Sequence, residues 1–108
     1  MSECQRDPAE FADLLRATRQ FCATSAAYLN ELPTEGRPRS IEYAEYYIGD
    51  LQEILHREVI DTSSMQEIAA FLEHIAIHLV EAGVLWLAGR GYELAAGWVI
   101  DFEDATEI

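Results

Sequence analysis

Apolar side chains recur every three or four residues along almost the whole chain, which is the spacing of one face of an α-helix. Clusters of proline, glycine and small polar residues interrupt this pattern in only a few places. With 108 residues the chain can build one small core, so its helices must pack against one another. The sequence therefore predicts an all-α fold in a single domain, 1–108, with three long helices and a shorter C-terminal helix packed as a bundle.

The first helix is predicted to begin at Pro8, because Asp7 supplies a capping side chain and proline suits the first helical position. Its apolar stripe continues to about Leu32, where the next proline ends it. We expect residues 1–6 to fray, and residues 33–39, which contain two prolines and a glycine, to form a loop.

Three further helices are predicted after this loop. The second follows a cap at Ser40, and the third begins at Met65, where the sequence has capping-box spacing. Gly83 is expected to kink or end the third helix, and a turn at residues 89–91 precedes the shorter fourth one. Residues 98–102 also fit a strand, but we favour a helix because an isolated strand would lack a pairing partner. The last residues, 103–108, are expected to form an acidic tail.

The chain is strongly acidic, and its charge is unevenly distributed. It carries 20 acidic residues and seven arginines, with no lysine, which gives a formal net charge of −13. Residues 40–108 alone hold fourteen acidic residues and two arginines, a net charge of −12. Such a surface repels phosphate backbones and anionic lipid, so the composition excludes direct nucleic-acid binding and docking on a membrane. A macromolecular partner of this chain is therefore expected to be basic.

One face of the second predicted helix combines acidic and aromatic side chains. Tyrosine is favoured at protein interfaces because its ring buries a large area while its hydroxyl still forms hydrogen bonds, and neighbouring carboxylates select a basic partner. The alternative is an acidic face that is only solvated. The candidate partner-binding residues are Glu42, Tyr43, Glu45, Tyr46, Asp50 and Glu53.

This face favours a non-enzymatic protein-binding module that occupies a basic surface of its partner, as inhibitors, immunity proteins, antitoxins and chaperones do. The expected partner is a basic protein, such as a nucleic-acid-binding protein or complex. The sequence has no nucleophile elbow, no glycine-rich phosphate loop and no dinucleotide fingerprint, so we expect neither an enzyme nor a cofactor. Cys22 lies in the apolar stripe of the first helix and is expected to be a buried, unreactive thiol.

A metal-binding helical bundle is the alternative interpretation. His74, His78 and Glu81 are spaced four and three residues apart, which places them along one ridge of the third helix. Imidazole and carboxylate groups at this spacing can hold zinc or iron. The sequence shows no outer-shell partners for such ligands and no repeated Glu-x-x-His motif, so in the favoured interpretation these side chains bind no metal.

The third predicted helix and the cysteine content bear on the location of the protein. The most apolar stretch, residues 68–88, has the length of a bilayer span, but its two glutamates and two histidines favour a soluble core helix. Two cysteines and the absence of a signal-peptide pattern at the start favour a reducing, cytoplasmic location.

The third predicted helix also bears on assembly. Its residues Ile77, Val84 and Leu85 project away from its inner apolar stripe, as in a helix shared with a second subunit. We therefore expect a two-fold symmetric homodimer.

Overall fold

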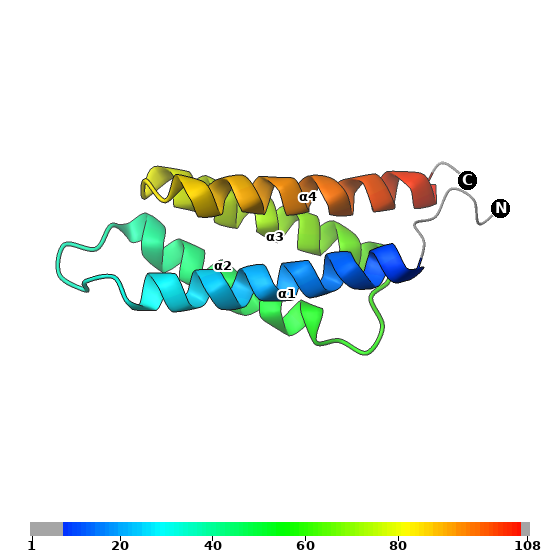
Figure 1. The fold of residues 1–108 in the computed structure, drawn as a ribbon, viewed down its shortest axis with the longest axis horizontal. Coiled ribbons are helices and arrows are strands. Elements are labelled where there is room, and N and C mark those ends of the chain that lie inside the picture. Colours follow the sequence, from blue (N-terminus) through cyan, green and yellow to red (C-terminus); the bar gives the residue numbers. More distant parts are fainter. Residues whose placement is uncertain (1–7, 107–108) are drawn as a thin grey trace.

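The computed structural model describes residues 8–106, and it describes side chains for residues 9–99. Within this range the chain forms four helices that run alternately up and down (Figure 1). No strand occurs among the described residues, so the predicted all-α bundle is confirmed. The helices are α1 (Pro8–Asn30), α2 (Arg39–Leu55), α3 (Thr62–Glu81) and α4 (Leu85–Thr106).

The four helices close into an elongated bundle of 54 × 23 × 19 Å. Helix α3 packs against both α2 and α4, and α1 packs against the same two helices from the opposite side. The α2–α3 seam and the α1–α4 seam therefore lie on opposite sides of the molecule. Between residues 8 and 106, no helix has both the length and the apolar character needed to cross a membrane.

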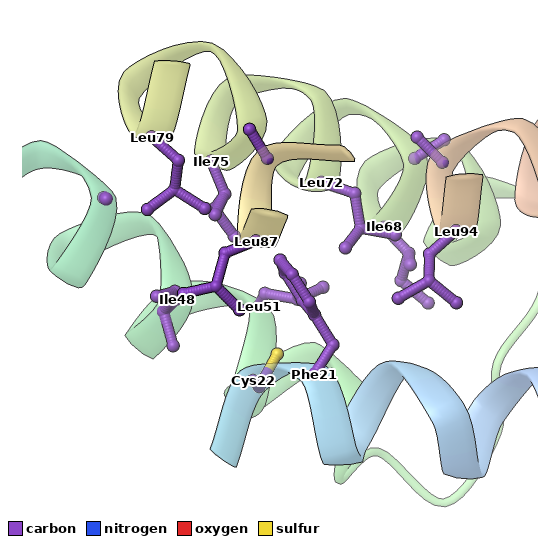
Figure 2. Close-up of a cluster of buried hydrophobic side chains, with 14 of the residues drawn as sticks. Phe21, Cys22, Ile48, Leu51, Ile68, Leu72, Ile75, Leu79, Leu87 and Leu94 are labelled. Atoms are coloured by element: carbon purple, nitrogen blue, oxygen red, sulfur yellow. The ribbon is translucent and has the colours of Figure 1, made fainter. Parts of the chain in front are cut away.

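Apolar side chains from all four helices meet in one core (Figure 2). Phe21 of α1, Leu51 of α2, Leu72 of α3 and Leu87 of α4 converge there, and all four are buried. Each such side chain, when fully buried, stabilises the fold by roughly 1.5–3 kcal/mol. The spacing of these residues in the sequence thus decides which face of each helix turns inward.

Trp98 joins the C-terminal part of α4 to the start of α1. Its indole Nε1 donates a 2.9 Å hydrogen bond to Thr18 Oγ1, and the Thr18 hydroxyl donates a 2.7 Å hydrogen bond to the carbonyl oxygen of Leu14. The Phe11 ring meets the indole edge-to-face, with centroids 5.6 Å apart. Because α4 is continuous from Leu85 to Thr106, the helix predicted for residues 98–102 is confirmed over the strand.

Two helix starts differ from the sequence prediction. The N-cap of α2 is Pro38, which makes no side-chain cap, and Ser40 lies inside the first turn instead. The N-cap of α3 is Asp61, whose carboxylate accepts a 2.8 Å hydrogen bond from the Ser64 backbone N–H. Ser64 is thus the capped residue rather than the cap, so α3 starts three residues before Met65.

The third helix ends next to Gly83, as the sequence allowed, whereas the predicted turn at residues 89–91 is wrong. Gly83 has φ +82°, and the N–H groups of Gly83 and Val84 donate to the carbonyl oxygens of Val80 and Leu79. This is a Schellman motif, in which glycine takes the left-handed conformation that ends a helix. The turn therefore lies at residues 82–84, and residues 89–91 are inside α4.

The remaining length differences follow from these boundaries. Helix α4 has 22 residues, rather than being the shorter helix expected, because it starts directly after the Gly83 turn. The backbone stays helical through Thr106, so most of the predicted acidic tail 103–108 belongs to α4. The expected frayed segment 1–6 and the expected cap Asp7 lie outside the described residues.

Candidate interaction surface

Five of the six residues predicted to bind a partner lie together on the outer side of α2. Glu42, Tyr43, Tyr46 and Glu53 are exposed, and Asp50 is half-buried. Tyr46 keeps 68% of its surface exposed and Tyr43 keeps 48%. Both tyrosine rings are therefore accessible to another molecule, with carboxylates beside them. We call these five residues the α2 surface.

Glu45, the sixth predicted residue, serves the fold instead. It lies on the side of α2 that faces α1, where Arg37 Nη1 donates to both of its carboxylate oxygens at 3.2 and 3.3 Å. Arg37 Nη2 also donates to the carbonyl oxygens of Leu29 and Leu32. This arginine thus satisfies the end of α1 and, through Glu45, fixes the α1–α2 connection to α2.

Tyr47 connects the α2 surface to the histidines of α3. The half-buried Tyr47 ring lies nearly parallel to His78, at 8° and 5.7 Å between centroids, and also stacks on His74 at 22° and 5.4 Å. It contacts Phe71 as well, at 5.8 Å. Tyr43 lies over the same His78 ring, at 5.2 Å. The α2 surface therefore rests on a row of rings contributed by α3.

Tyr46 extends this row outward. Its ring meets Tyr47 edge-to-face, at 83° and 5.8 Å between centroids. Edge-to-face contacts of this kind are favourable and hold a ring in a preferred orientation. The most exposed aromatic side chain of the α2 surface is thus braced from below by a ring that is itself packed on α3.

Sequence reasoning did not include Tyr47 among the candidate residues and treated the histidines as a separate ridge, so it missed their contact. A signal was nevertheless present. Two helices joined by a short loop pack antiparallel, so a step of four residues forward on one helix is matched by a step of four residues back on the other. Tyr43 contacts His78, and Tyr47, four residues later, contacts His74, four residues earlier.

The three candidate metal ligands on α3 do not act together. His78 Nδ1 lies 2.8 Å from Glu81 Oε1, whereas the His74 ring is stacked on Tyr47. Among the residues that the structure describes, no three histidine, cysteine, aspartate or glutamate side chains are grouped as metal ligands would be. The observed geometry thus pairs one histidine with one carboxylate and directs the other toward an aromatic contact.

The arginines near the loops are engaged in holding the fold. Arg19 Nη2 donates a 2.6 Å hydrogen bond to the carbonyl oxygen of Leu55, at the end of α2. Arg57 Nη1 donates to Ser64 Oγ at 3.1 Å and to Glu67 Oε1 at 3.2 Å, which closes the α2–α3 connection. Together with Arg37, these side chains place positive charge at helix ends and connections, whereas Arg39, exposed at the start of α2, lies one turn before Glu42 on the side of the α2 surface.

The carboxylates of the α2 surface nevertheless stay unpaired among the described residues. Glu42, Asp50 and Glu53 form no ion pair with any described residue, although all three lie within one helix. Like charges held on one helix face repel one another, and this repulsion is relieved when a cation binds. A positively charged group that binds to the α2 surface is therefore electrostatically favoured.

The side of the bundle formed by α3 and α4 carries exposed apolar residues. Ile77 is 44% exposed and Leu85 is 64% exposed, as expected of a second apolar face. Val84 is buried, however, because the Gly83 turn carries its side chain into the core. Val80 and Tyr92, which the sequence analysis did not single out, are exposed on the same two helices.

A hollow of about 670 Å³ lies elsewhere, between α1 and α4. Phe21, Leu87 and the exposed ring of Trp86 are among the residues that line it. Tyr28 meets Trp86 edge-to-face, with centroids 5.4 Å apart. Because the α1–α4 seam is opposite the α2–α3 seam, Tyr28 is a tyrosine remote from the α2 surface.

Cys22 is fully buried, as predicted, and burial raises the pKa of its thiol to about 12. A thiol in this state is protonated at neutral pH and is a poor nucleophile. The features that remain for an inference about function are thus the α2 surface and its aromatic support. Comparisons with protein-family models, curated proteins and solved structures found no match for this chain.

Proposed function

We propose that this protein is a non-enzymatic binding module whose α2 surface occupies a basic site on a partner protein, as inhibitors, immunity proteins, antitoxins and chaperones do. The observation that carries this proposal is that the carboxylates beside the exposed Tyr46 ring have no cationic partner among the described residues. A basic partner supplies the missing charge and covers the ring in one step.

The two kinds of side chain have different roles in such a complex. Glu42, Asp50 and Glu53 attract and orient the partner at long range, which raises the association rate. Tyr46 is the anchor, because a tyrosine ring buries a large area with few torsions to immobilise. Its support by Tyr47 reduces the ordering cost of binding further.

The partner that fits this surface is a basic protein, such as a nucleic-acid-binding protein or complex, and the place of action is the cytoplasm. A formal net charge of −13 supports a basic partner. The free, buried thiol of Cys22 is compatible with a reducing compartment.

The exposed apolar residues of α3 and α4 support a homodimer in addition. Ile77, Val80 and Leu85 would be buried if two copies paired through this side of the bundle. Light scattering should then give about twice the monomer mass of 12.2 kDa, and Ile77→Glu should return the protein to a monomer. A monomeric wild-type protein would refute the dimer without affecting the α2 surface.

The proposed function is tested by affinity capture with three immobilised proteins. These are the wild type, a site variant and a control variant with the same change of charge and the loss of one tyrosine. The site variant is Glu42→Lys, Tyr46→Ala, Asp50→Lys, and the control variant is Glu10→Lys, Tyr28→Ala, Glu31→Lys. All control positions are exposed on or next to α1, and circular dichroism verifies that each protein is folded.

The expected result is a basic protein that the wild type and the control variant retain, that the site variant does not retain, and that elutes with salt. Equal retention by the site variant would contradict the proposal, because the α2 surface would then be only a solvated face. Equal loss from the control variant would contradict it as well, because net charge alone would then explain the binding.

A further inference from the structure

Tyr46 has a carboxylate one helical turn away on each side. Glu42 precedes it by four residues and Asp50 follows it by four, a spacing that places side chains on the same ridge of a helix. Glu53 lies on this side of α2 one turn further along. With 68% of its surface exposed, the Tyr46 ring offers a flat apolar face between acidic groups.

We infer that the α2 surface recognises an arginine side chain of the partner, with the guanidinium stacked on the Tyr46 ring and hydrogen-bonded by the carboxylates of Glu42 and Asp50. This inference rests on the proposed function, which requires only a basic partner. It adds the chemical identity of the recognised group and the residue that selects it.

The selection follows from the different chemistry of the two basic side chains. A guanidinium is planar and weakly hydrated, so it can stack on an aromatic ring while its edge donates two parallel hydrogen bonds to a carboxylate. An ammonium group is compact and strongly hydrated, and it interacts with a carboxylate as a point charge. Carboxylates alone already favour arginine through the paired hydrogen bonds. A ring flanked by carboxylates adds the stacking contact and so increases the preference for arginine.

The contact between Tyr46 and Tyr47 lowers the free-energy cost of binding an arginine at this surface. Tyr47 holds the Tyr46 ring edge-to-face and is itself packed against His74, His78 and Phe71 of α3. A braced ring presents its face without first losing rotational freedom, and this lowers the cost of stacking. None of the arginines with ion pairs in the described part of the chain is bonded to a carboxylate of the α2 surface, although the exposed Arg39 lies three residues before Glu42.

The inference is tested with two probes, an oligo-arginine peptide and an oligo-lysine peptide of equal length and charge. Their dissociation constants are measured by fluorescence anisotropy with the intact protein. We expect the arginine peptide to bind on the order of tenfold more tightly, because it combines stacking with paired hydrogen bonds. Tyr46→Leu should reduce this preference severalfold while leaving binding of the lysine peptide unchanged, and Tyr46→Phe should keep the full preference.

Tyr28→Leu serves as the matched control, because Tyr28 lies at the opposite seam of the bundle, and it should behave as the wild type does. Equal affinity of the wild type for the two peptides would overturn the inference and leave the proposed function standing. An arginine preference that Tyr46→Leu leaves undiminished would also overturn it. Absence of binding by either peptide would contradict the proposed function itself, because the α2 surface would then have no affinity for cationic chains.

Discussion

The ring of Tyr47 on α2 and the imidazole of His78 on α3 lie parallel to within 8°, with centroids 5.7 Å apart. This contact unites two regions that the sequence presents as unrelated, an acidic and aromatic face on one helix and a histidine ridge on the next. Tyr43 contacts the same His78 ring, and Tyr46 contacts Tyr47, so both exposed tyrosines pack on side chains that are held by α3. Rings that are already ordered lose less conformational entropy when a partner binds.

Substitutions of Tyr47 and Tyr46 are therefore predicted to change the free energy of unfolding by very different amounts, although the two residues are neighbours in sequence. Tyr47→Ala removes contacts with Phe71, His74 and His78 and should lower the free energy of unfolding by about 2 kcal/mol. Tyr46→Ala should change it by less than about 0.5 kcal/mol, because that side chain is mostly exposed. Urea denaturation measures both, and equal losses would contradict the assigned roles.

The sequence predicted the helical class of the fold because apolar spacing directly determines which residues are buried. Phe21, Leu51 and Leu72 follow that spacing and occupy the core. Helix ends were less predictable, because several residues in one loop can act as the cap. The sequence predicted a start at Met65, and only the structure shows that the Asp61 carboxylate accepts from Ser64 and starts α3 earlier.

The outer residues of the candidate site were predictable for a similar reason. Helical periodicity separates Glu42 and Tyr46 from the core face of α2, and both are exposed. Periodicity cannot identify tertiary partners. It gave no sign that Arg37 would engage Glu45, or that Tyr47 would stack on His78, because those contacts depend on how loops and neighbouring helices place the side chains.

Removal of two buried hydroxyl groups of α1 is predicted to change the free energy of unfolding in opposite directions. Thr18→Val leaves the indole N–H of the fully buried Trp98 without an acceptor and should cost about 1–3 kcal/mol. Ser25 Oγ is buried without a hydrogen-bond partner among the described residues, so Ser25→Ala should stabilise the fold by about 1 kcal/mol. Urea denaturation of the two variants provides the comparison, and a loss of stability in Ser25→Ala would reveal an unrecognised partner for that hydroxyl.

Alanine substitutions at Gly83, in the turn before α4, and at Gly89, inside α4, are predicted to change the stability in opposite directions. The reason is that the two glycines have different backbone conformations. Gly83→Ala forces a side chain into the left-handed region at φ +82° and should cost about 1–2 kcal/mol. Gly89 lies within α4, where an added Cβ would meet nothing within 4 Å, so Gly89→Ala should stabilise the protein by up to about 1 kcal/mol. Thermal melts of both variants test the turn at residues 82–84, since a turn at 89–91 would reverse the order.

Cys22 is predicted to be inert in the folded protein. Its pKa is raised to about 12 from an ordinary 9.0 by burial, so folding favours the neutral thiol. The stabilisation from the raised pKa is fully present below about pH 9 and is lost as the pH rises from there toward the folded-state value. In a Cys4→Ser background, a thiol reagent at about pH 8 should leave the native protein unlabelled and label it in urea. Rapid labelling without urea would show that the thiol is accessible.

The central claim, that the carboxylates of the α2 surface recruit a basic protein, is tested most directly by the salt dependence of the association rate with the captured partner. The Debye length shortens from about 30 Å at 0.01 M salt to about 8 Å at 0.15 M, so long-range attraction is largely screened over this range. Stopped-flow measurements should show an association rate that falls steeply with salt for the wild type and for Glu10→Lys. The dependence should be much shallower for Asp50→Lys, and Tyr46→Ala should mainly raise the dissociation rate. An association rate that is independent of salt, or one that Asp50→Lys and Glu10→Lys reduce equally, would contradict recruitment by the α2 surface.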